Sequence, residues 1–372
     1  MKVLVTGAAG FIGKNLVERL KGSGCPEVSE VFEFTRDSDM HMLERYCAES
    51  DFVFHLAGVN RPSDPAEFME GNADLTTHLL STLRQSNVCP VVLASSTQAA
   101  FDNPYGQSKK IAEDIVIGYA QDTGASAFIY RLPGVFGKWC RPNYNSVVAT
   151  FCYNTARGIP VRIDHPTTRL ALVYIDDVVD EFVRALRGEA TQIEGGLYAV
   201  PVVHEAILGD TAGLLDEFKE SREKLTVPDM GDAFTKKLYA TYLSYLPTDA
   251  FSYPLEMRSD ERGSFTEIIR TPDRGQFSVN ISRPGIVKGN HWHNTKNEKF
   301  VVVDGEGVIR FRKVGEDAVI EYFVSGEKIE VVDIPPGYTH NIENLGDTDM
   351  VTFMWSNECF DPDNPDTFWL EV

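Results

Sequence analysis

The sequence has no run of apolar residues long enough to cross a lipid bilayer. A membrane-spanning helix needs about 20 mostly apolar residues in a row. We also expect no secretory leader, because a strand-like segment begins at Lys2 with no basic region, apolar region or cleavage site before it. We therefore expect a cytoplasmic protein that has no membrane partner.

Basic residues are few, since 35 Lys and Arg face 55 Asp and Glu, which gives a formal net charge of −20. This excess of negative charge disfavours nucleic acids and anionic surfaces as partners. A small phosphorylated ligand remains compatible with it wherever a few cations gather. The six cysteines are scattered without a CxxC pair, which is typical of reduced thiols in the cytoplasm.

The 372 residues suffice for two domains. Up to about residue 190, short apolar segments alternate with segments of helical periodicity, which predicts a parallel sheet with helices on both faces. The expected strands are 2–6, 31–34, 52–56, 91–94 and 127–130. The expected helices include 11–20, 76–83 and 109–119, with further ones at 207–218 and 234–243. We predict a first domain of residues 1–245.

The pattern changes after about Leu246, where apolar and polar residues begin to alternate with a period of two. Many short strands separated by turn residues predict an antiparallel sandwich or barrel. The expected strands are 265–269, 277–281, 299–303, 307–311, 320–324, 328–334 and 350–355. Residues 246–372 therefore form the predicted second domain.

Three glycines, Gly7, Gly10 and Gly13, follow the first expected strand and open the first expected helix. They suit a tight turn, a close approach of the backbone to a pyrophosphate, and close packing of helix on strand. The helix N-terminus then faces the phosphates. We expect these glycines, with Phe11 and Ile12 between them, to bind a nicotinamide dinucleotide.

The end of the second expected strand carries charges of both signs, in the order Arg36-Asp37. An acidic residue there would bind the ribose hydroxyls of NAD, whereas Arg36 would pair with the 2′-phosphate of NADP. The two residues thus indicate opposite cofactors. We favour NADPH, with Arg36 as one of its ligands.

Tyr105 and Lys109 are four residues apart, which places them on one face of a helix. A nearby ammonium stabilises a tyrosinate, so we expect Lys109 to lower the pKa of Tyr105. Tyr105 can then exchange a proton with a carbonyl or alcohol while the cofactor exchanges a hydride. Ser96, at the end of the preceding strand, would orient the carbonyl. These three residues are the expected catalytic set.

Residues 1–245 resemble an extended short-chain dehydrogenase/reductase that acts on nucleotide sugars. Besides the GxxGxxG spacing and the Tyr-x3-Lys pair, the resemblance rests on Asp51-Phe52-Val53-Phe54-His55-Leu56-Ala57-Gly58, Asn72, Arg131-Leu132-Pro133 and Tyr174-Ile175-Asp176-Asp177. It implies that Leu56, Ala57 and Gly58 line the cofactor, together with Tyr105 and Lys109.

The same resemblance implies that the segment after Pro133 leads into a substrate loop. Many relatives have an asparagine after this proline, where the present chain has Gly134, so that contact with the sugar nucleotide is not carried over. Lys138, Arg141 and Asn145 are the local candidates for binding the substrate pyrophosphate, because they form a cationic spot in an acidic chain.

Three histidines and one glutamate have the spacing of a metal site: His291, His293, Glu298 and His340. We expect His291-x-His293 at a turn and the start of a strand, where residues two apart face the same side. Glu298 and His340 are expected on neighbouring strands. Three imidazoles and a carboxylate suit Zn²⁺, although Mn, Fe and Ni also accept such ligands.

Residues 246–372 resemble a cupin, a double-stranded β-helix barrel. The segment Asp260-Glu261-Arg262-Gly263-Ser264-Phe265-Thr266-Glu267 also resembles the opening of dTDP-sugar 3,5-epimerases. In that family a histidine at the position of His291 acts as a base without metal, whereas His291 here belongs to the expected ligand set. The base is therefore left open between Lys288, Tyr338 and a metal-bound water.

The whole chain resembles bifunctional capsular polysaccharide enzymes in which such a reductase is fused to a metal-binding cupin. The resemblance implies a UDP-linked 4-keto-6-deoxy amino sugar, UDP-2-acetamido-2,6-dideoxy-4-hexulose, as substrate. The cupin would epimerise C3 and the reductase would then reduce C4 with NADPH. The product would be UDP-N-acetyl-6-deoxy-L-talosamine, on the route to N-acetyl-L-fucosamine in surface polysaccharide. A homodimer is implied as well.

Two other functions fit parts of the sequence. The protein could be a 4-keto reductase only, with a structural metal in a cupin that serves dimerisation. It could instead be an NADPH or nucleotide-sugar sensor that signals through the barrel, although a sensor has no need of the proton donor that Tyr105 supplies.

Overall fold

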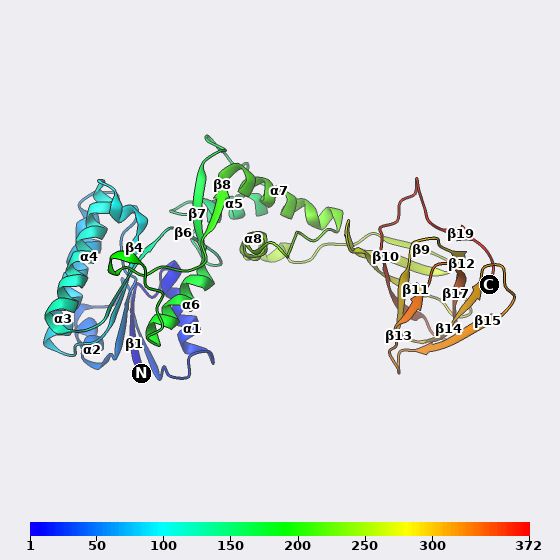
Figure 1. The fold of residues 1–372 in the computed structure, drawn as a ribbon, viewed down its shortest axis with the longest axis horizontal. Coiled ribbons are helices and arrows are strands. Elements are labelled where there is room, and N and C mark those ends of the chain that lie inside the picture. Colours follow the sequence, from blue (N-terminus) through cyan, green and yellow to red (C-terminus); the bar gives the residue numbers. More distant parts are fainter. The chain divides into compact units, whose positions relative to one another are not determined.

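The computed structural model describes residues 1–372 and divides into two compact units. One unit comprises Met1–Asp216 with Gly231–Pro247, and the other comprises Glu217–Met230 with Thr248–Val372 (Figure 1). Because Glu217–Met230 joins the second unit, the two units are not simply consecutive along the chain. The sequence-based boundary between residues 245 and 246 stays a prediction. No helix in the chain has the length and apolar character needed to cross a bilayer.

The N-terminal unit is built on a parallel sheet of five strands in the order β2-β1-β3-β4-β5. Its strands are β1 Lys2–Thr6, β2 Glu30–Phe34, β3 Phe52–His55, β4 Val91–Ser96 and β5 Ala127–Leu132. The order reverses at β1 and β3, so the carboxyl ends of these strands border the crevice where ligands of such sheets bind.

Helices cover both faces of this sheet, as Figure 1 shows. They are α1 Phe11–Lys21, α2 Met40–Glu49, α3 Leu75–Gln85, α4 Pro104–Thr123 and α6 Ile175–Leu186. One apolar core packs α1 and α6 on the sheet, around Leu16 and Phe182. A second core packs α2, α3 and α4 on the opposite face, around Leu79 and Val116. The predicted Rossmann-type architecture is confirmed.

A smaller sheet of order β6-β7-β8 lies beyond the main one. Its strands are β6 Gly134–Phe136, β7 Arg169–Tyr174 and β8 His204–Ile207, and the remaining helices are α5 Val147–Ala156, α7 Leu208–Lys224 and α8 Ala233–Leu243. Short helical turns are η1 Met69–Asp74, η2 Thr97–Ala100, η3 Glu194–Gly196 and η4 Thr248–Ala250. Of these helices, α5 packs against α8.

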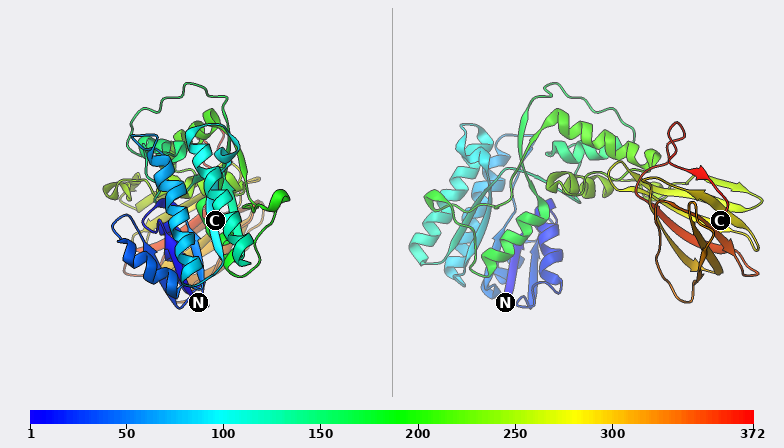
Figure 2. Two further views of the ribbon diagram at one scale, coloured as in Figure 1. Left: turned by 90° about the vertical axis from the view of Figure 1, so that its left-hand side faces the viewer. Right: turned by 45° about the vertical axis from the view of Figure 1, so that its right-hand side comes forward.

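The C-terminal unit consists of two antiparallel sheets that face each other (Figure 2). The first has the order β16-β13-β18-β11-β10-β9 and the second the order β15-β14-β17-β12-β19. The strands are β9 Met257–Asp260, β10 Gly263–Thr271, β11 Gly275–Ser282, β12 Val287–Trp292, β13 Glu298–Asp304, β14 Glu306–Lys313, β15 Val319–Ser325, β16 Val332–Ile334, β17 Tyr338–Asn344, β18 Met350–Ser356 and β19 Phe368–Trp369. The predicted all-β fold is thus confirmed.

The interior of this unit is apolar at one end and polar at the other. Phe300, Ile309 and Ile342 belong to the apolar core between the sheets. Along β11 the pattern is the reverse of an ordinary strand, because Gln276, Ser278, Asn280 and Ser282 are buried while the apolar residues between them are only half-buried. A polar lining inside a barrel-like fold leaves room for a polar ligand.

Most expected elements occur within a few residues of their predicted ends, but one is wrong. We expected a strand over 328–334, and only β16, Val332–Ile334, forms there. Lys328 instead bridges back to Ser325 in a tight turn after β15. Alternation alone does not mark where a turn ends and a ladder of hydrogen bonds begins.

Candidate functional site

The turn between β1 and α1 has the compact geometry expected of a dinucleotide-binding loop. Gly7 has a φ of +69°, and a Cβ atom there would lie 2.7 Å from the backbone nitrogen of Ala57. A Cβ atom on Gly13 would lie only 2.2 Å from the carbonyl oxygen of Gly7. Both positions therefore require glycine. Phe11 and Ile12 open α1 directly after Gly10, so their backbone N–H groups start the helix.

The segment Leu56–Gly58 follows β3 and is held by a buried polar network. His55 bridges Thr6 and Thr76, with its ring nitrogens 2.7 and 2.9 Å from their hydroxyls. Asn72 accepts from the backbone N–H of Val59 at 3.0 Å and donates to its carbonyl at 3.1 Å. In the sequence, His55 and Asn72 stand out only because they belong to motifs shared with the reductase family. The structure shows that their side chains hold this loop in place.

Tyr105 and Lys109 lie one turn apart on α4, as expected. The helix begins at Pro104 because the Asn103 side chain accepts from the backbone N–H of Gly106 at 2.8 Å. The Tyr105 hydroxyl donates to Asn60 Oδ1 at 3.0 Å. Lys109 is buried, and its Nζ donates to the carbonyl of Ala94 at 3.3 Å.

The expected effect of Lys109 on Tyr105 is wrong for this structure. Burial raises the pKa of Tyr105 above its ordinary value, and only a hydrogen bond with Ser96 acts to lower it. The Lys109 Nζ lies 6.0 Å from the centre of the Tyr105 ring. Burial also lowers the pKa of Lys109, to about 8. The sequence spacing identifies the pair but not the burial that governs its titration.

Gly58 brings the cofactor-lining segment against the catalytic lysine. A Cβ atom on Gly58 would lie 2.9 Å from Lys109 Nζ and 2.7 Å from Asn72 Oδ1. The lysine ammonium thus sits beside the backbone of Leu56–Gly58. The sequence assigns these residues to one site, and the structure brings them together.

Arg36 lies just beyond the end of β2 and is exposed. The acidic residue on the same strand end, Glu33, is already engaged by Lys21, whose Nζ lies 2.5 Å from its carboxylate. Asp37 is exposed as well, and its backbone N–H donates to the Thr35 hydroxyl at 3.3 Å. Arg36 is therefore an accessible cation at the position where the two cofactors differ.

The three candidate substrate residues occupy the loop between β6 and α5, and each is held differently. Lys138 donates to Asp176 at 2.6 Å and is half-buried. Arg141 is exposed, with its guanidinium 5.3 Å from the centre of the Tyr144 ring. Asn145 is exposed. Lys138 is thus already ion-paired, which the sequence does not reveal.

A buried ion pair that the sequence analysis missed supports the end of β4. Arg131 donates twice to Glu113, at 2.9 and 2.6 Å, and Ser95 donates to the same carboxylate at 2.6 Å. The Glu113 side chain is 1% exposed. Since Ser95 precedes Ser96, this cluster fixes the strand end that carries the expected catalytic serine.

In the C-terminal unit, His291, His293, Glu298 and His340 form one cluster. Their ligand atoms all lie within 4.8 Å of one another, and the last three residues are buried. Glu298 Oε2 lies 3.4 Å from Nε2 of both His293 and His340. Several of these buried atoms have no hydrogen-bond partner: His293 Nε2, Glu298 Oε2 and both ring nitrogens of His340.

This donor set fits a divalent metal. Buried polar atoms are normally paired, so the unpartnered atoms of His293, Glu298 and His340 that converge here with His291 have the arrangement of metal ligands. Burial lowers the pKa of His291 to about 4, which keeps its ring neutral as a ligand requires. Burial would raise the pKa of Glu298, yet the neighbouring imidazoles of His293 and His340 hold it well below the ordinary value.

Two details of the expected placement are wrong. His291 lies at the end of β12 and His293 just after it, not at the start of a strand. Glu298 begins β13, in the sheet opposite to β12 and β17, so it is not on a strand neighbouring that of His340. The cluster therefore joins both sheets, which a list of strands along a sequence does not reveal.

The chain end forms a support for the metal cluster that the sequence analysis missed. The backbone carbonyl of Asp366 lies 2.5 Å from His293 Nδ1. The Asp366 carboxylate accepts from the backbone N–H groups of Asn294, Thr295 and Lys296 at 2.7 to 2.9 Å. Although burial acts to raise the pKa of Asp366, these hydrogen bonds hold it far below its usual range.

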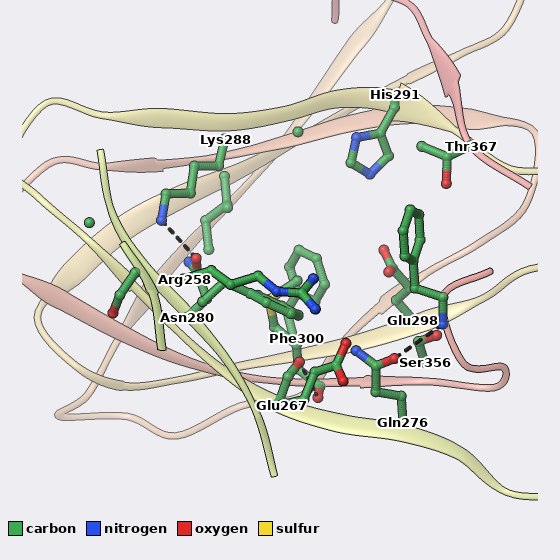
Figure 3. A pocket seen from close by; sticks show the side chains of 18 of the residues that line it. Arg258, Glu267, Gln276, Asn280, Lys288, His291, Glu298, Phe300, Ser356 and Thr367 are labelled. Atoms are coloured by element: carbon green, nitrogen blue, oxygen red, sulfur yellow. Dashed lines mark hydrogen bonds between the residues drawn. The ribbon is translucent and has the colours of Figure 1, made fainter. Parts of the chain in front are cut away.

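The cluster opens into a cavity of about 600 Å³ between the sheets (Figure 3). His291 and Glu298 line one part of it, and Lys288 lines another, bonded to Asn280 Oδ1 at 2.8 Å. Arg258 lines the cavity too. Side chains that the sequence analysis missed are Arg258, Gln276, Ser278, Asn280 and Phe300.

The two side chains considered as epimerase base, Lys288 and Tyr338, lie in different cavities. Lys288 lines the cavity, and burial lowers its pKa. Tyr338, by contrast, lines a separate cavity with Phe311 and Tyr322. Among the protein side chains considered from the sequence, only Lys288 therefore shares a cavity with His291.

Comparisons with known proteins agree with both units. Residues 3–200 match the NAD dependent epimerase/dehydratase family, and residues 258–368 match the polysaccharide biosynthesis C-terminal domain. The chain is 46% identical over 373 residues to a UDP-2-acetamido-2,6-beta-L-arabino-hexul-4-ose reductase of Pseudomonas aeruginosa, covering 100% of this chain and 99% of the relative.

Solved structures agree over the same length. The capsular polysaccharide assembling protein CapF of Staphylococcus aureus superposes with a TM-score of 0.94 and 54% identity, covering 100% of each chain. UDP-glucuronic acid 4-epimerase of Bacillus cereus, solved in complex with NAD, has a TM-score of 0.55 and 20% identity over 66% of this chain and 96% of its own. At that identity the second similarity supports the fold alone.

Proposed function

The chain belongs to the NAD-dependent epimerase/dehydratase family and shares its whole length with CapF-type proteins, and from this premise we propose that it is a UDP-4-keto-sugar reductase of surface polysaccharide synthesis. Full-length similarity to a named 4-ketohexulose reductase supports this function. The observation that carries it is the placement of Tyr105 beside Ser96 and one helical turn from Lys109, which is buried against Gly58.

The residues of this site would supply the proton side of the reaction. A bound nicotinamide cofactor would supply the hydride to C4 of the keto sugar. Tyr105 would donate its hydroxyl proton to the developing C4 alkoxide, with Ser96 as a second hydrogen-bond donor to the same oxygen. Lys109, whose Nζ lies beside Gly58, would instead contact the bound cofactor.

We propose NADPH as the cofactor. Glu33 is ion-paired with Lys21, whereas Arg36 is exposed at the same strand end and suits a 2′-phosphate. The substitution Arg36→Ala should raise the KM for NADPH and leave that for NADH unchanged. Equal effects on both cofactors would contradict this preference.

The reductase assignment can be tested with a single reaction. The purified protein, NADPH and a UDP-linked 4-keto-6-deoxy amino sugar should consume many equivalents of the reduced cofactor. Tyr105→Phe should lower kcat by roughly 10²- to 10⁴-fold, the usual weight of general acid catalysis. The matched control Tyr153→Phe, away from the set, should keep full activity. Consumption that stops at one equivalent would support the sensor function instead.

We further propose that the C-terminal cavity epimerises the same substrate at C3 before reduction. A ketone at C4 acidifies the C3 hydrogen, so removal of that proton and its return on the other face invert the centre. His291, His293, Glu298 and His340 would hold Zn²⁺, which would supply Lewis-acid stabilisation of the oxyanion. The combined product would be UDP-N-acetyl-6-deoxy-L-talosamine.

Lys288 is the protein side chain that best suits a part in this proton transfer. Its pKa is lowered by burial, and it lies in the cavity with His291. Two of its N–H groups donate to Asn280 Oδ1 and to the carbonyl of Ile281, both at 2.8 Å. These bonds would use both N–H groups of the neutral amine, which the lowered pKa favours, and leave its lone pair to accept the C3 proton.

The rival function keeps the reductase and makes the metal structural. With the keto sugar in D₂O and no reduced cofactor, the epimerase proposal predicts that deuterium is incorporated at C3. Protein that has first been treated with a chelator should no longer catalyse this exchange. Exchange that survives complete metal removal, at unchanged unfolding temperature, would mean that the metal has no part in the proton transfer.

We also propose a homodimer formed through the strand edges of the C-terminal unit. Large apolar side chains lie exposed on and near β15 and β16: Ile320, Tyr322, Phe323, Ile329 and Val331. Phe323 is 69% exposed. Exposed apolar edges of this kind mark contact surfaces.

A further inference from the structure

Trp139 adopts a backbone conformation that its side chain disfavours. It follows β6, has a φ of +69°, and its side chain is 46% exposed. A bulky residue in the left-handed region is an outlier. Such strain persists only where the surrounding structure fixes the backbone, and it gathers at functional sites.

Contacts on both sides of Trp139 fix this conformation. Gly137 packs so closely on α6 that a Cβ atom there would lie 2.2 Å from Ile175 Cγ2. On the other side, the carbonyl of Cys140 accepts from the Tyr245 hydroxyl at 2.5 Å. These contacts fix the backbone on both sides of Trp139. The indole remains exposed to solvent.

Two ammonium groups lie against the exposed indole. The Nζ atoms of Lys14 and Lys138 are 4.8 and 5.6 Å from the ring centre. Lys138 has Asp176 as an ion-pair partner at 2.6 Å, whereas Lys14, on the first turns of α1, has no carboxylate partner. A planar ring flanked by cations is suited to a ligand that is both planar and anionic.

Asn15 adds an unused hydrogen-bond acceptor beside these residues. It is 4% exposed, and its Nδ2 donates to the carbonyls of Phe11 and Lys138, at 2.9 and 3.4 Å. Its Oδ1 has no partner. Buried polar atoms are normally satisfied, so this oxygen is a free acceptor that a ligand hydroxyl, such as that of a ribose, can use.

We propose that Trp139, Lys14 and Lys138 form a binding surface for a nucleoside diphosphate. The indole would stack on the base and the two ammonium groups would contact the phosphates. The inference rests on the proposed function, because the dinucleotide cofactor and the nucleotide-sugar substrate both carry this chemistry. The backbone strain at Trp139 would then be the cost of presenting the ring to the ligand.

Intrinsic fluorescence tests this surface on the full-length protein. The other three tryptophans, Trp292, Trp355 and Trp369, lie in the C-terminal unit, so quenching that needs Trp139 reports on the N-terminal unit. UDP and 2′-phospho-ADP-ribose serve as separate probes. Quenching of Trp139 by UDP, seen as a signal that is lost in Trp139→Phe, assigns the surface to the substrate, and quenching of Trp139 by the second probe assigns it to the cofactor. No quenching by either probe overturns the proposal.

Two variants separate binding from folding. Trp139→Phe should remove the part of the quenching that comes from residue 139, while Trp369→Phe should leave that part unchanged; any response of Trp355, which lines the C-terminal cavity, should persist in both variants. Trp139→Gly, which removes the ring, should bind the active probe roughly ten-fold more weakly, the scale of one base–aromatic stack, yet unfold at the same or a higher temperature because glycine tolerates this φ. Unchanged affinity by calorimetry in Trp139→Gly would overturn the proposal.

The outcome is independent of the reductase test. A protein that binds UDP through Trp139 but reduces no 4-keto sugar would contradict the proposed function and leave this surface standing. A protein that reduces the sugar with unaltered kinetics in Trp139→Gly would keep the function and remove the surface.

Discussion

Lys109 combines burial with a charge, and this makes the reductase site sensitive to pH. The side chain is 6% exposed, and its pKa falls from 10.5 to about 8, because burial outweighs the attraction of Glu113. In the unfolded chain the same group keeps its proton up to its ordinary pKa. Between the two values the unfolded state binds more protons than the folded state.

We therefore expect the free energy of unfolding to rise with pH across this window. Below pH 8 the folded protein must bury a charged Lys109, which lowers its stability. As Lys109 loses its proton between pH 8 and 10.5, this destabilisation disappears, so stability rises with pH. The gain over the variant Lys109→Met, which does not titrate, should reach about 3 kcal/mol. Urea unfolding of both proteins at each end of the window measures it. A constant difference between them would show that Lys109 does not titrate in this range.

The residues of both sites could be identified from the sequence where chemistry depends on local spacing. Tyr105 and Lys109 meet because helical periodicity alone places them on one face. The direction of the Tyr105 pKa shift was not predictable, since it depends on burial by residues distant in the chain. The ion pair of Arg131 with Glu113 was missed for the same reason.

At the scale of elements, the β1–α1 turn depends on the lack of side chains at two glycines. A methyl group at residue 13 would meet the carbonyl oxygen of Gly7 at 2.2 Å and the Cα of Ala8 at 2.9 Å, and both contacts are with backbone. Gly13→Ala should destabilise the protein by on the order of 1–3 kcal/mol and weaken cofactor binding. Thermal unfolding and a cofactor titration measure both effects.

Gly118 provides the matched control within helix α4. A Cβ atom there meets no atom within 4 Å, so Gly118→Ala should stabilise the protein by up to about 1 kcal/mol through helix propensity. If Gly13→Ala bound the cofactor as tightly as Gly118→Ala, close packing at the turn would not be required for binding.

The segment around Asp366 supports the metal cluster by holding His293 and the backbone that follows it. Its carboxylate orders the three backbone N–H groups that follow His293. Asp366→Ala should weaken Zn²⁺ binding by roughly 10- to 100-fold, as for other supporting groups around metal ligands. Competition with a chromogenic chelator gives the affinity. Asp363→Ala, on the same exposed segment, should bind as the unaltered protein does, and equal losses in both variants would contradict a specific role of Asp366.

Elements differ in how far the sequence determines them. The alternation of residues 277–281 correctly indicates a strand, but it does not say which face is inside, and β11 buries Gln276, Ser278 and Asn280. Likewise, Glu298 reaches His340 across two sheets. Such pairings come from tertiary packing, which overrides the local pattern.

At the scale of the whole molecule, the exposed apolar edge of the C-terminal unit predicts self-association. Phe323→Asp places a charge in the proposed interface, and loss of a central aromatic contact commonly costs 2 kcal/mol or more, so the dimer Kd should rise at least roughly 30-fold. Sedimentation over a concentration series measures it. Ile193→Asp, an exposed apolar position of the N-terminal unit, is the control, and a dimer that tolerates Phe323→Asp would place the interface elsewhere.

We propose two active sites in one chain that act on the same C4 ketone. This ketone would activate C3 in the C-terminal cavity and accept hydride at the nucleotide site. The most direct test is the appearance of deuterium at C3 of the UDP-linked 4-keto sugar in D₂O without reduced cofactor. We predict exchange in the unaltered protein and in Tyr105→Phe, and none in Glu298→Gln. Exchange that persists in Glu298→Gln but disappears in Tyr105→Phe, or no exchange in any of the three proteins, would contradict the account.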